Sequence, residues 1–410
     1  MAMVKISGGN SQTIDEEAYV CQPSHASHPR GIFYGENPLD FSFPLFLLEA
    51  TLIILLVRSL HSLLRPLKQP RIVSKILGGI LIGPSVLGRH KTFTNNVFPE
   101  NGTYVFKNLG LVGFIYFLFI SGVKTDIKTV AKAGKKQLSI GLIGVLVPFL
   151  TVLSIAIATR KTLDKELQRV PIMGGVASAF AISTFPVLYQ VVKELNLLSS
   201  EIGKLALSSV LVSDCVGIVC IVLFEATRSE PIDALWVFVS FVGMAAVIGG
   251  FRQAMVWIVK TTPEGKPVDP TYVVGILLVV LVIAAACDIT GLAMGNGPLW
   301  LGLAVPEGPP LGAALVEGTE TFVSDVMAPI SYAFVGMYTD VSAMAGQWSS
   351  SVKPLFIMAV AAYLSKVVTI VVVAMFFEMP VRDSLALGLV MSLRGQLEIL
   401  IFMHWMDIEV

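Results

Sequence analysis

Long apolar runs separated by short polar segments dominate the sequence. A helix that crosses a bilayer needs about 20 mostly apolar residues. By that measure the candidate windows are 43–64, 71–88, 108–125, 137–158, 171–191, 200–227, 234–258, 271–289, 292–306, 319–340, 353–378 and 382–405. The pattern predicts an all-α membrane protein with about twelve transmembrane helices within residues 43–410, preceded by a polar, flexible segment, residues 1–42.

Composition supports the same class. Of the 410 residues, 54% are hydrophobic and 14% are charged, whereas a soluble domain carries about a quarter charged residues. Lysine and arginine together number 29, and so do aspartate and glutamate together. The chain therefore has no excess of positive charge that would favour binding of nucleic acid. The sequence contains no phosphate-binding loop, no HExxH and no CxxC pair. These features exclude a nucleic-acid binder and favour a protein that is not an enzyme and needs no cofactor.

Loop charge predicts the orientation of the spans. Twelve spans place both chain ends on one side, called side A, and the opposite side is side B. The loops assigned to side B carry more lysine and arginine than those of side A. The positive-inside rule therefore predicts that side B faces the cytosol.

Three charged residues fall near the middle of separate windows. They are Asp214, Lys366 and Arg394. An ionisable group at the bilayer centre costs roughly 2.5–3.5 kcal/mol on insertion scales. One acid and two bases predict a shared polar centre, the alternative being buried salt bridges that only hold helices together.

Two windows contain signals that interrupt a helix. The fifth includes Ser183, Thr184 and Pro186, and the twelfth includes the pair Arg394–Gly395. Proline frees backbone carbonyls, which together with two hydroxyls suit an alkali cation; a plain proline kink is the alternative reading. The two breaks lie in spans that are seven apart. Because an odd offset reverses the direction in which the second span crosses the membrane relative to the first, the pattern predicts inverted repeats. Arg394 would neutralise the facing negative helix ends.

Several motifs together resemble one transporter family. They are Gly83–Gly88 (GPSVLG), Phe117–Val123 (FLFISGV), Ser183–Pro186 (STFP), Ser213–Asp214 and Leu393–Glu398 (LRGQLE). From about residue 40 onward the chain resembles the plant cation/proton exchangers called CHX, of the monovalent cation–proton antiporter superfamily. The resemblance implies a 13-helix sodium/proton-antiporter fold with two unwound crossing helices, a homodimer, and a plant endomembrane or plasma membrane.

The resemblance also implies roles at matching positions. Thr184 matches the hydroxyl of the first unwound helix, and Asp214 matches the carboxylate that binds cation and proton. Lys366 matches a membrane lysine important to the family, and Arg394 stands where many members have lysine before glycine. Ser213 stands where many relatives carry asparagine or a second acid, so one carboxylate is expected here.

Two departures from the family pattern stand out. Lys124 follows Gly122–Val123 where members often have glutamate. The family also has a further transmembrane helix and a long cytosolic C-terminal domain, which the windows above do not include. The chain is therefore expected to be truncated at its C-terminal end.

The function predicted from these residues is secondary antiport of K⁺, with Na⁺ as the alternative, for H⁺. Proton and cation would compete at Asp214, and Lys366 would neutralise the empty carboxylate. One alternative is a cation pathway without proton coupling. Another is a truncated, non-transporting dimer partner or regulator.

Overall fold

The computed structural model describes most of the predicted membrane region. The described residues are 2–5, 19–22, 29, 32–67, 69–125, 134–163, 168–183, 185–228, 231–263, 266–290, 292, 294–306, 308–337 and 353–393. Within these residues, helices occupy every predicted window, the last as far as Met391. Among them, 7 helical segments are long and apolar enough to cross a membrane. The prediction of an all-helical, multi-span membrane region is therefore confirmed.

One set of helices packs together as bundle 1. Its helices are α1 (Ser42–Leu64), α2 (Arg71–Ile82), α3 (Lys91–Val97), α4 (Glu100–Val123), α11 (Pro270–Ile289), α12 (Asn296–Ala304), α13 (Leu311–Phe322) and α14 (Ala328–Met337). The main contacts join α12 to α4 and α14 to α2. A π-helical turn, Val323–Met327, connects α13 to α14.

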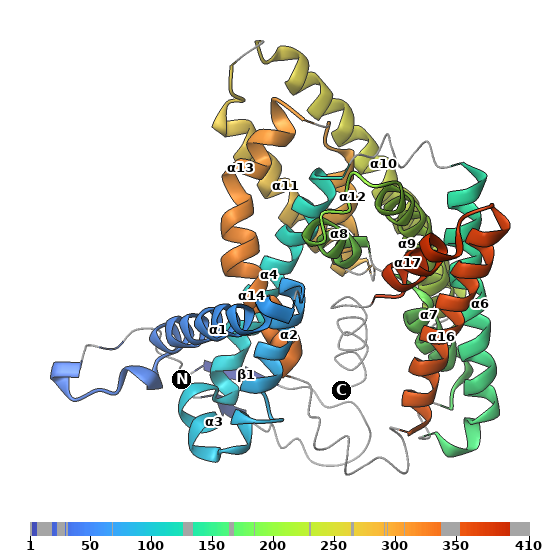
Figure 1. Ribbon diagram of the computed structural model, residues 1–410. Helices are drawn as coiled ribbons and strands as arrows, with labels where there is room; N and C mark the ends of the chain where they lie inside the picture. Colours follow the sequence, from blue (N-terminus) through green and yellow to red (C-terminus); the bar gives the residue numbers. More distant parts are fainter. Residues whose placement is uncertain are drawn as a thin grey trace.

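A second set forms bundle 2 on the opposite side of the molecule (Figure 1). Its helices are α6 (Lys135–Ala158), α7 (Val170–Ala181), α9 (Glu201–Arg228), α16 (Lys353–Phe376) and α17 (Val381–Met391). Two further helices contact both bundles, α8 (Phe185–Glu194) and α10 (Pro231–Thr261). Helix α10 therefore connects the bundles in sequence as well as in space, whereas α8 lies between two helices of bundle 2 in sequence and reaches bundle 1 only in space.

Glycine permits the closest helix contacts of bundle 1. A Cβ atom on Gly122 of α4 would lie 2.5 Å from the Leu299 carbonyl oxygen of α12. On the facing side, a Cβ on Gly302 would lie 2.2 Å from the Phe119 carbonyl oxygen. Small residues allow backbones to approach in this way at membrane helix interfaces, which explains why α4 and α12 pack so tightly.

The N-terminal segment contains regular structure that the hydropathy pattern did not predict. Strand β1 (Ala2–Lys5) pairs antiparallel with β2 (Tyr19–Gln22), with Val4 opposite Val20. Valine and tyrosine favour extended backbone, and a four-residue strand is too short to produce a recognisable alternating pattern. Two 3₁₀ turns, Ile32–Tyr34 and Pro38–Asp40, precede α1.

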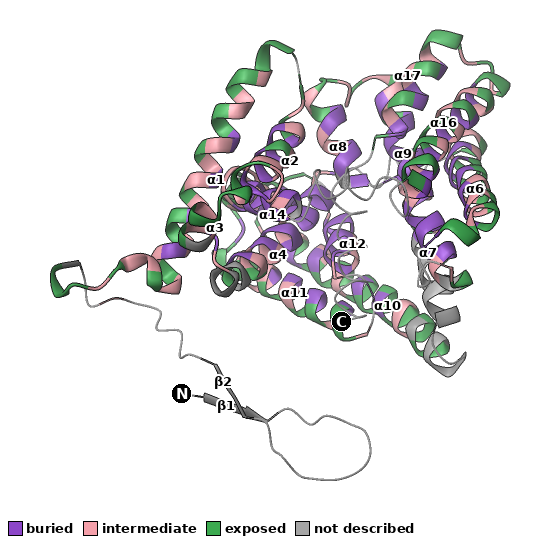
Figure 2. Cartoon of the chain, turned by 90° about the horizontal axis from the view of Figure 1, so that it is seen from below, coloured by how far each residue is buried: buried purple, intermediate pink, exposed green. Residues whose placement is uncertain are grey.

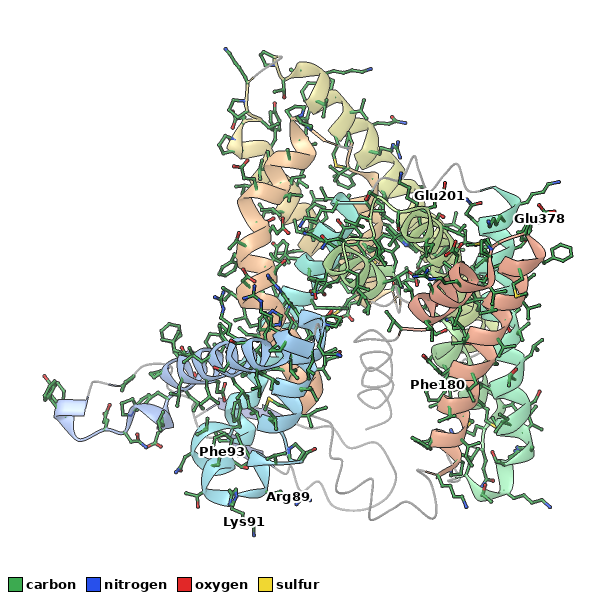
Figure 3. All side chains as sticks on the ribbon, viewed as in Figure 1. Arg89, Lys91, Phe93, Phe180, Glu201 and Glu378 are labelled. Atoms are coloured by element: carbon green, nitrogen blue, oxygen red, sulfur yellow. The ribbon has the colours of Figure 1, made fainter. Side chains whose placement is uncertain are left out.

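Some charged residues near helix ends lie at opposite ends of the molecule. Figure 3 shows Arg89 and Lys91 at one face and Glu201 and Glu378 at the other, the faces predicted as sides A and B. Buried residues gather where helices face one another, and exposed residues cover the outer surfaces (Figure 2). Many of these exposed side chains are large and apolar, among them Trp236 and Phe238 of α10, as expected for a surface that faces lipid.

Candidate functional site

The fifth span is divided into two half-helices. Helix α7 ends at Ala181 and α8 begins at Phe185, so the chain is not helical at Ile182 and Ser183. Pro186 occupies the first turn of α8, where a missing backbone N–H breaks no helical hydrogen bond. The sequence explains this local structure, because proline starts the second half-helix after the first has ended.

Asp214 lies at the start of the second half-helix. It belongs to α9 and is half-buried, and its Oδ2 accepts a hydrogen bond of 2.9 Å from the Phe185 backbone N–H. The first N–H groups of a helix lack partners within the helix and carry a partial positive charge. The carboxylate therefore caps α8 and is stabilised there as an anion.

Lys366 lies at the end of the first half-helix. Its side chain, on α16, is 2% exposed, and its Nζ donates a hydrogen bond of 2.5 Å to the Ala181 carbonyl oxygen. The last carbonyls of a helix carry a partial negative charge that favours a cation. The interrupted span thus has an acid at its positive end and a base at its negative end.

Ser183 connects the interruption to the twelfth span. Its side chain is 1% exposed and its Oγ donates a 2.8 Å hydrogen bond to the carbonyl oxygen of Met391, the last residue of α17. The end of α17 therefore meets the gap between α7 and α8. Ser213, next to Asp214 on α9, is also buried.

The structure thus brings Ser183, Asp214 and Lys366 to one interruption. Thr184, Arg394 and Gly395, which the sequence analysis also assigned to this centre, lie outside the described residues.

A glycine that the sequence analysis did not select lets this arrangement form. Gly217 lies one turn beyond Ser213 on α9, and a Cβ there would come within 2.4 Å of Cγ1 of Ile182. The non-helical backbone between α7 and α8 therefore packs directly on α9. A small residue near a mid-span acid is a signal in the sequence, but it does not reveal which segment approaches it.

Replacing Gly217 by valine is expected to destabilise the protein by about 1–3 kcal/mol, because overpacking forces side chains and backbone to shift. Thermal unfolding of the purified protein in detergent measures the change. Gly243→Val on α10 is the matched control, because nothing lies within 4 Å of a Cβ at that position. Equal stabilities of the two variants would show that α9 does not support the interruption at Gly217.

Bundle 1 contains two buried charged residues that the sequence analysis did not select. Lys75 lies in the second turn of α2, where its Nζ donates to the Ser324 carbonyl oxygen at 3.3 Å. Its ammonium also lies 5.4 Å from the centre of the Tyr332 ring. Glu49 is fully buried in α1, without a hydrogen-bond partner for its carboxyl oxygens within the described structure.

Lys124 belongs to a cluster of charges on side B. It follows the last residue of α4 and its Nζ pairs with Glu320 of α13. The same Glu320 oxygen is 3.1 Å from Nζ of Lys193 on α8. Burial lowers the pKa of Lys124, and the hydrogen bond to Glu320 opposes that shift. The sequence analysis noted Lys124 as a departure from the family pattern but did not identify its partner.

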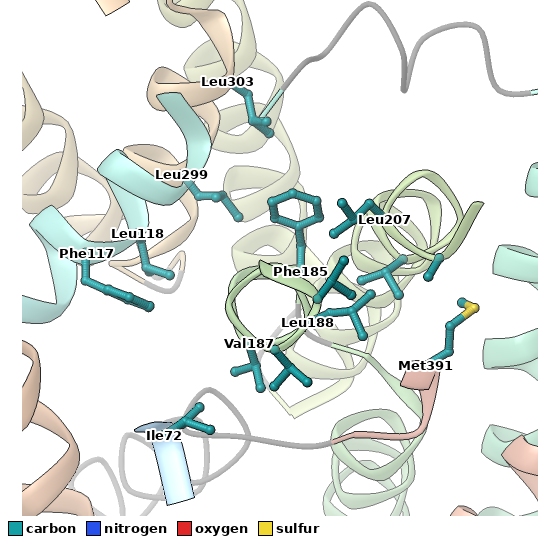
Figure 4. Close-up of a cluster of buried hydrophobic side chains, with 14 of the residues drawn as sticks. Ile72, Phe117, Leu118, Phe185, Val187, Leu188, Leu207, Leu299, Leu303 and Met391 are labelled. Carbon is teal, nitrogen blue, oxygen red and sulfur yellow. The ribbon is translucent and has the colours of Figure 1, made fainter. Parts of the chain in front are cut away.

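Helix α8 is packed by side chains from both bundles. Figure 4 shows Phe185, Val187 and Leu188 of α8 at the centre of a buried cluster. The residues around them come from bundle 1 (Ile72, Phe117, Leu118, Leu299 and Leu303), from α9 (Leu207) and from α17 (Met391). A movement of one bundle relative to the other would therefore have to rearrange the contacts of α8.

The family of the chain follows from its sequence similarity. The model of a family described as sodium/hydrogen exchanger, transmembrane, matches residues 51–407. The chain belongs to this family. This family is one of transporters, not of enzymes.

Several curated proteins of Arabidopsis thaliana are similar to this chain. Cation/H(+) antiporter 25 is 43% identical over 395 residues, which are 95% of this chain and 46% of the relative. Cation/H(+) antiporter 24 is 42% identical over 394 residues, with the same coverage of 95% and 46%. The chain thus spans less than half the length of these relatives. They confirm the resemblance to plant cation/proton exchangers.

A solved structure shows the same fold. The chain resembles the sodium proton antiporter MjNhaP1 from Methanocaldococcus jannaschii, determined at pH 8, with a TM-score of 0.59. The match covers 90% of this chain and 88% of the other at 14% sequence identity. The likeness supports an antiporter-like arrangement of helices.

Proposed function

We propose that the protein exchanges a monovalent cation, K⁺ or Na⁺, for H⁺ across a membrane, with Asp214 as the group that binds both ions. The position of the Asp214 carboxylate carries this proposal, since it faces the N-terminal end of α8 inside an interrupted membrane span. Family membership supports the class of activity.

The oxygen atoms near Asp214 suit an alkali cation. Hydroxyl groups of Ser183, Thr184 and Ser213 would supply neutral oxygen ligands, together with carbonyls at the end of α7. Hard cations bind oxygen ligands, and unwound helices provide them in secondary transporters. When the cation leaves, a proton on Asp214 would remove the negative charge from the partly buried site.

Lys366 and Arg394 would compensate the helix ends at the crossing. Lys366 supports this role through its hydrogen bond to the Ala181 carbonyl at the end of α7. A fixed cation there offsets the partial negative charge at the end of α7 when no ion is bound. Electroneutral exchange at one carboxylate follows, because the site carries either one cation or one proton.

In the proposed transport cycle, bundle 2 moves relative to bundle 1. Bundle 2 carries Asp214 and Lys366, and the fold of bundle 1 suits a fixed scaffold that forms a homodimer. We infer twelve of thirteen helices of an inverted-repeat fold, with the second interruption at Gly395. The membrane is an endomembrane or plasma membrane of a plant cell.

Cation-selective flux in vesicles tests the proposal. Purified protein is reconstituted into liposomes with an imposed pH gradient, and uptake of K⁺ and of Na⁺ is measured separately. Uptake is expected to require the gradient, and an opposite cation gradient should move protons in return. Cation uptake that does not depend on the pH gradient would indicate a cation pathway without proton coupling. Absence of flux from folded protein would indicate a non-transporting partner or regulator.

A further inference from the structure

The last turn of α8 reaches across to bundle 1 on side B. Lys193 and Glu194 are its final residues, about two and a half turns beyond Phe185, which donates to Asp214. Helix α8 therefore has the ion-binding carboxylate at one end and charged contacts at the other. A change at either end can move the other, because the helix between them is short and packed.

Two polar contacts join this turn to bundle 1. Nζ of Lys193 lies 3.1 Å from Oε1 of Glu320 on α13. Oε2 of Glu194 accepts a 2.6 Å hydrogen bond from the backbone N–H of Arg71, the first residue of α2. The partners are separated by 127 and 123 residues in sequence, so these contacts exist only while α8 is seated against bundle 1.

Neighbouring charges hold the bundle 1 side of these contacts in place. Lys124 pairs with Glu320 within bundle 1 and keeps its carboxylate directed at the end of α8. Lys75, buried in α2, lies close enough to Glu194 for Coulombic attraction. Arg71 also lies 3.8 Å from Asp325 of the π-helical turn, through an exposed ion pair.

We infer that Lys193 and Glu194 form a latch with Glu320 and the Arg71 backbone, and that this latch holds the side B approach to Asp214 closed. The inference rests on the proposed function, since it assigns the latch to the transport cycle. Opening on side B requires the last turn of α8 to leave α13 and α2.

The strength of the latch suits repeated opening. The side chains of Lys193 and Glu320 are 47% and 34% exposed, and exposed ion pairs contribute little stability individually because solvent screens them. Several such contacts together select the closed arrangement, and thermal motion can still break them during each cycle. Salt is expected to weaken the latch for the same reason.

A distance measurement tests the latch without requiring transport. Spin labels are placed at Leu195→Cys, just after α8, and Glu317→Cys on α13, both exposed positions, with the four native cysteines replaced by serine. Pulsed electron paramagnetic resonance in liposomes then gives the distribution of distances between α8 and α13.

Glu320→Gln is expected to shift this distribution to longer distances, because Lys193 loses its ionic partner. Reversing both charges, with Lys193→Glu and Glu320→Lys, should restore the short distances that either single reversal loses. Lys204→Gln is the matched control, because Lys204 is an exposed lysine near the start of α9 with no ion pair in the described structure, and it should leave the distribution unchanged.

High salt supplies a second test that needs no latch variant. Raising the ionic strength with choline chloride should shift the labelled protein toward the same longer distances. An unchanged distribution in Glu320→Gln and in high salt would overturn the latch, even if the protein transports ions. A shift in both with no ion flux would retain the contact as a latch between the bundles and reject the proposed function.

Discussion

Replacing Asp214 by asparagine is expected to reduce cation/proton exchange to the level of empty vesicles. Asparagine keeps the size of the side chain and an oxygen that can accept the hydrogen bond from the Phe185 N–H. It cannot bind a proton in the working pH range, and it offers a cation no negative charge. Flux driven by a pH gradient, measured in matched vesicles, checks the result.

Asp288→Asn is the control for this substitution. Asp288 is exposed near the end of α11, so the same chemical change there should leave exchange unchanged. Both variants should show the elution profile and thermal stability of the unmodified protein. Proton-coupled flux that persists in Asp214→Asn would assign the ion-binding carboxylate to another residue.

Replacing Lys366 by methionine is expected to have the second largest effect. Methionine fills a similar volume but cannot donate to the Ala181 carbonyl, which then ends α7 inside the protein without its cationic partner. Loss of one partner of a buried hydrogen bond costs about 1–3 kcal/mol, and more where a charged group is involved. We expect lower thermal stability together with strongly reduced exchange.

Lys353→Met separates this effect from a general effect of lysine loss. Lys353 begins the same helix, α16, but is exposed, so its replacement should change neither stability nor flux. If Lys366→Met unfolds at the same temperature as Lys353→Met, the lysine does not hold the end of α7. Normal exchange in a stable Lys366→Met protein would remove Lys366 from the site.

The sequence is sufficient to predict the membrane helices because apolar run length is a local property. Each window contains a helix in the described structure, including short ones such as α12. Asp214 and Lys366 were also identifiable individually, since charges in apolar windows are rare. Their contacts with opposite ends of a divided helix could not be predicted, because the hydrogen bonds to Phe185 and Ala181 depend on how α9 and α16 pack.

Other charged residues show the limit of reasoning from local pattern. Lys75 stands near the start of its window and resembles a loop residue, yet the π-helical turn of a distant segment supplies a carbonyl that lets it be buried. Glu320 lies in a segment whose hydropathy does not indicate a role for this residue. Its pairing with Lys124 and Lys193 depends on three helices that are far apart in sequence.

The central claim is that one cation and one proton compete for Asp214. The apparent Kd for K⁺ or Na⁺, measured by binding to the purified protein over a range of pH, tests it most directly. Because linkage is reciprocal, competition with one proton makes the apparent Kd fall by about tenfold for each unit of rising pH while the carboxyl is protonated, and then level off. Asp214→Asn should lose this dependence. A Kd that is constant with pH, or a dependence that persists in Asp214→Asn, would contradict competition at this residue.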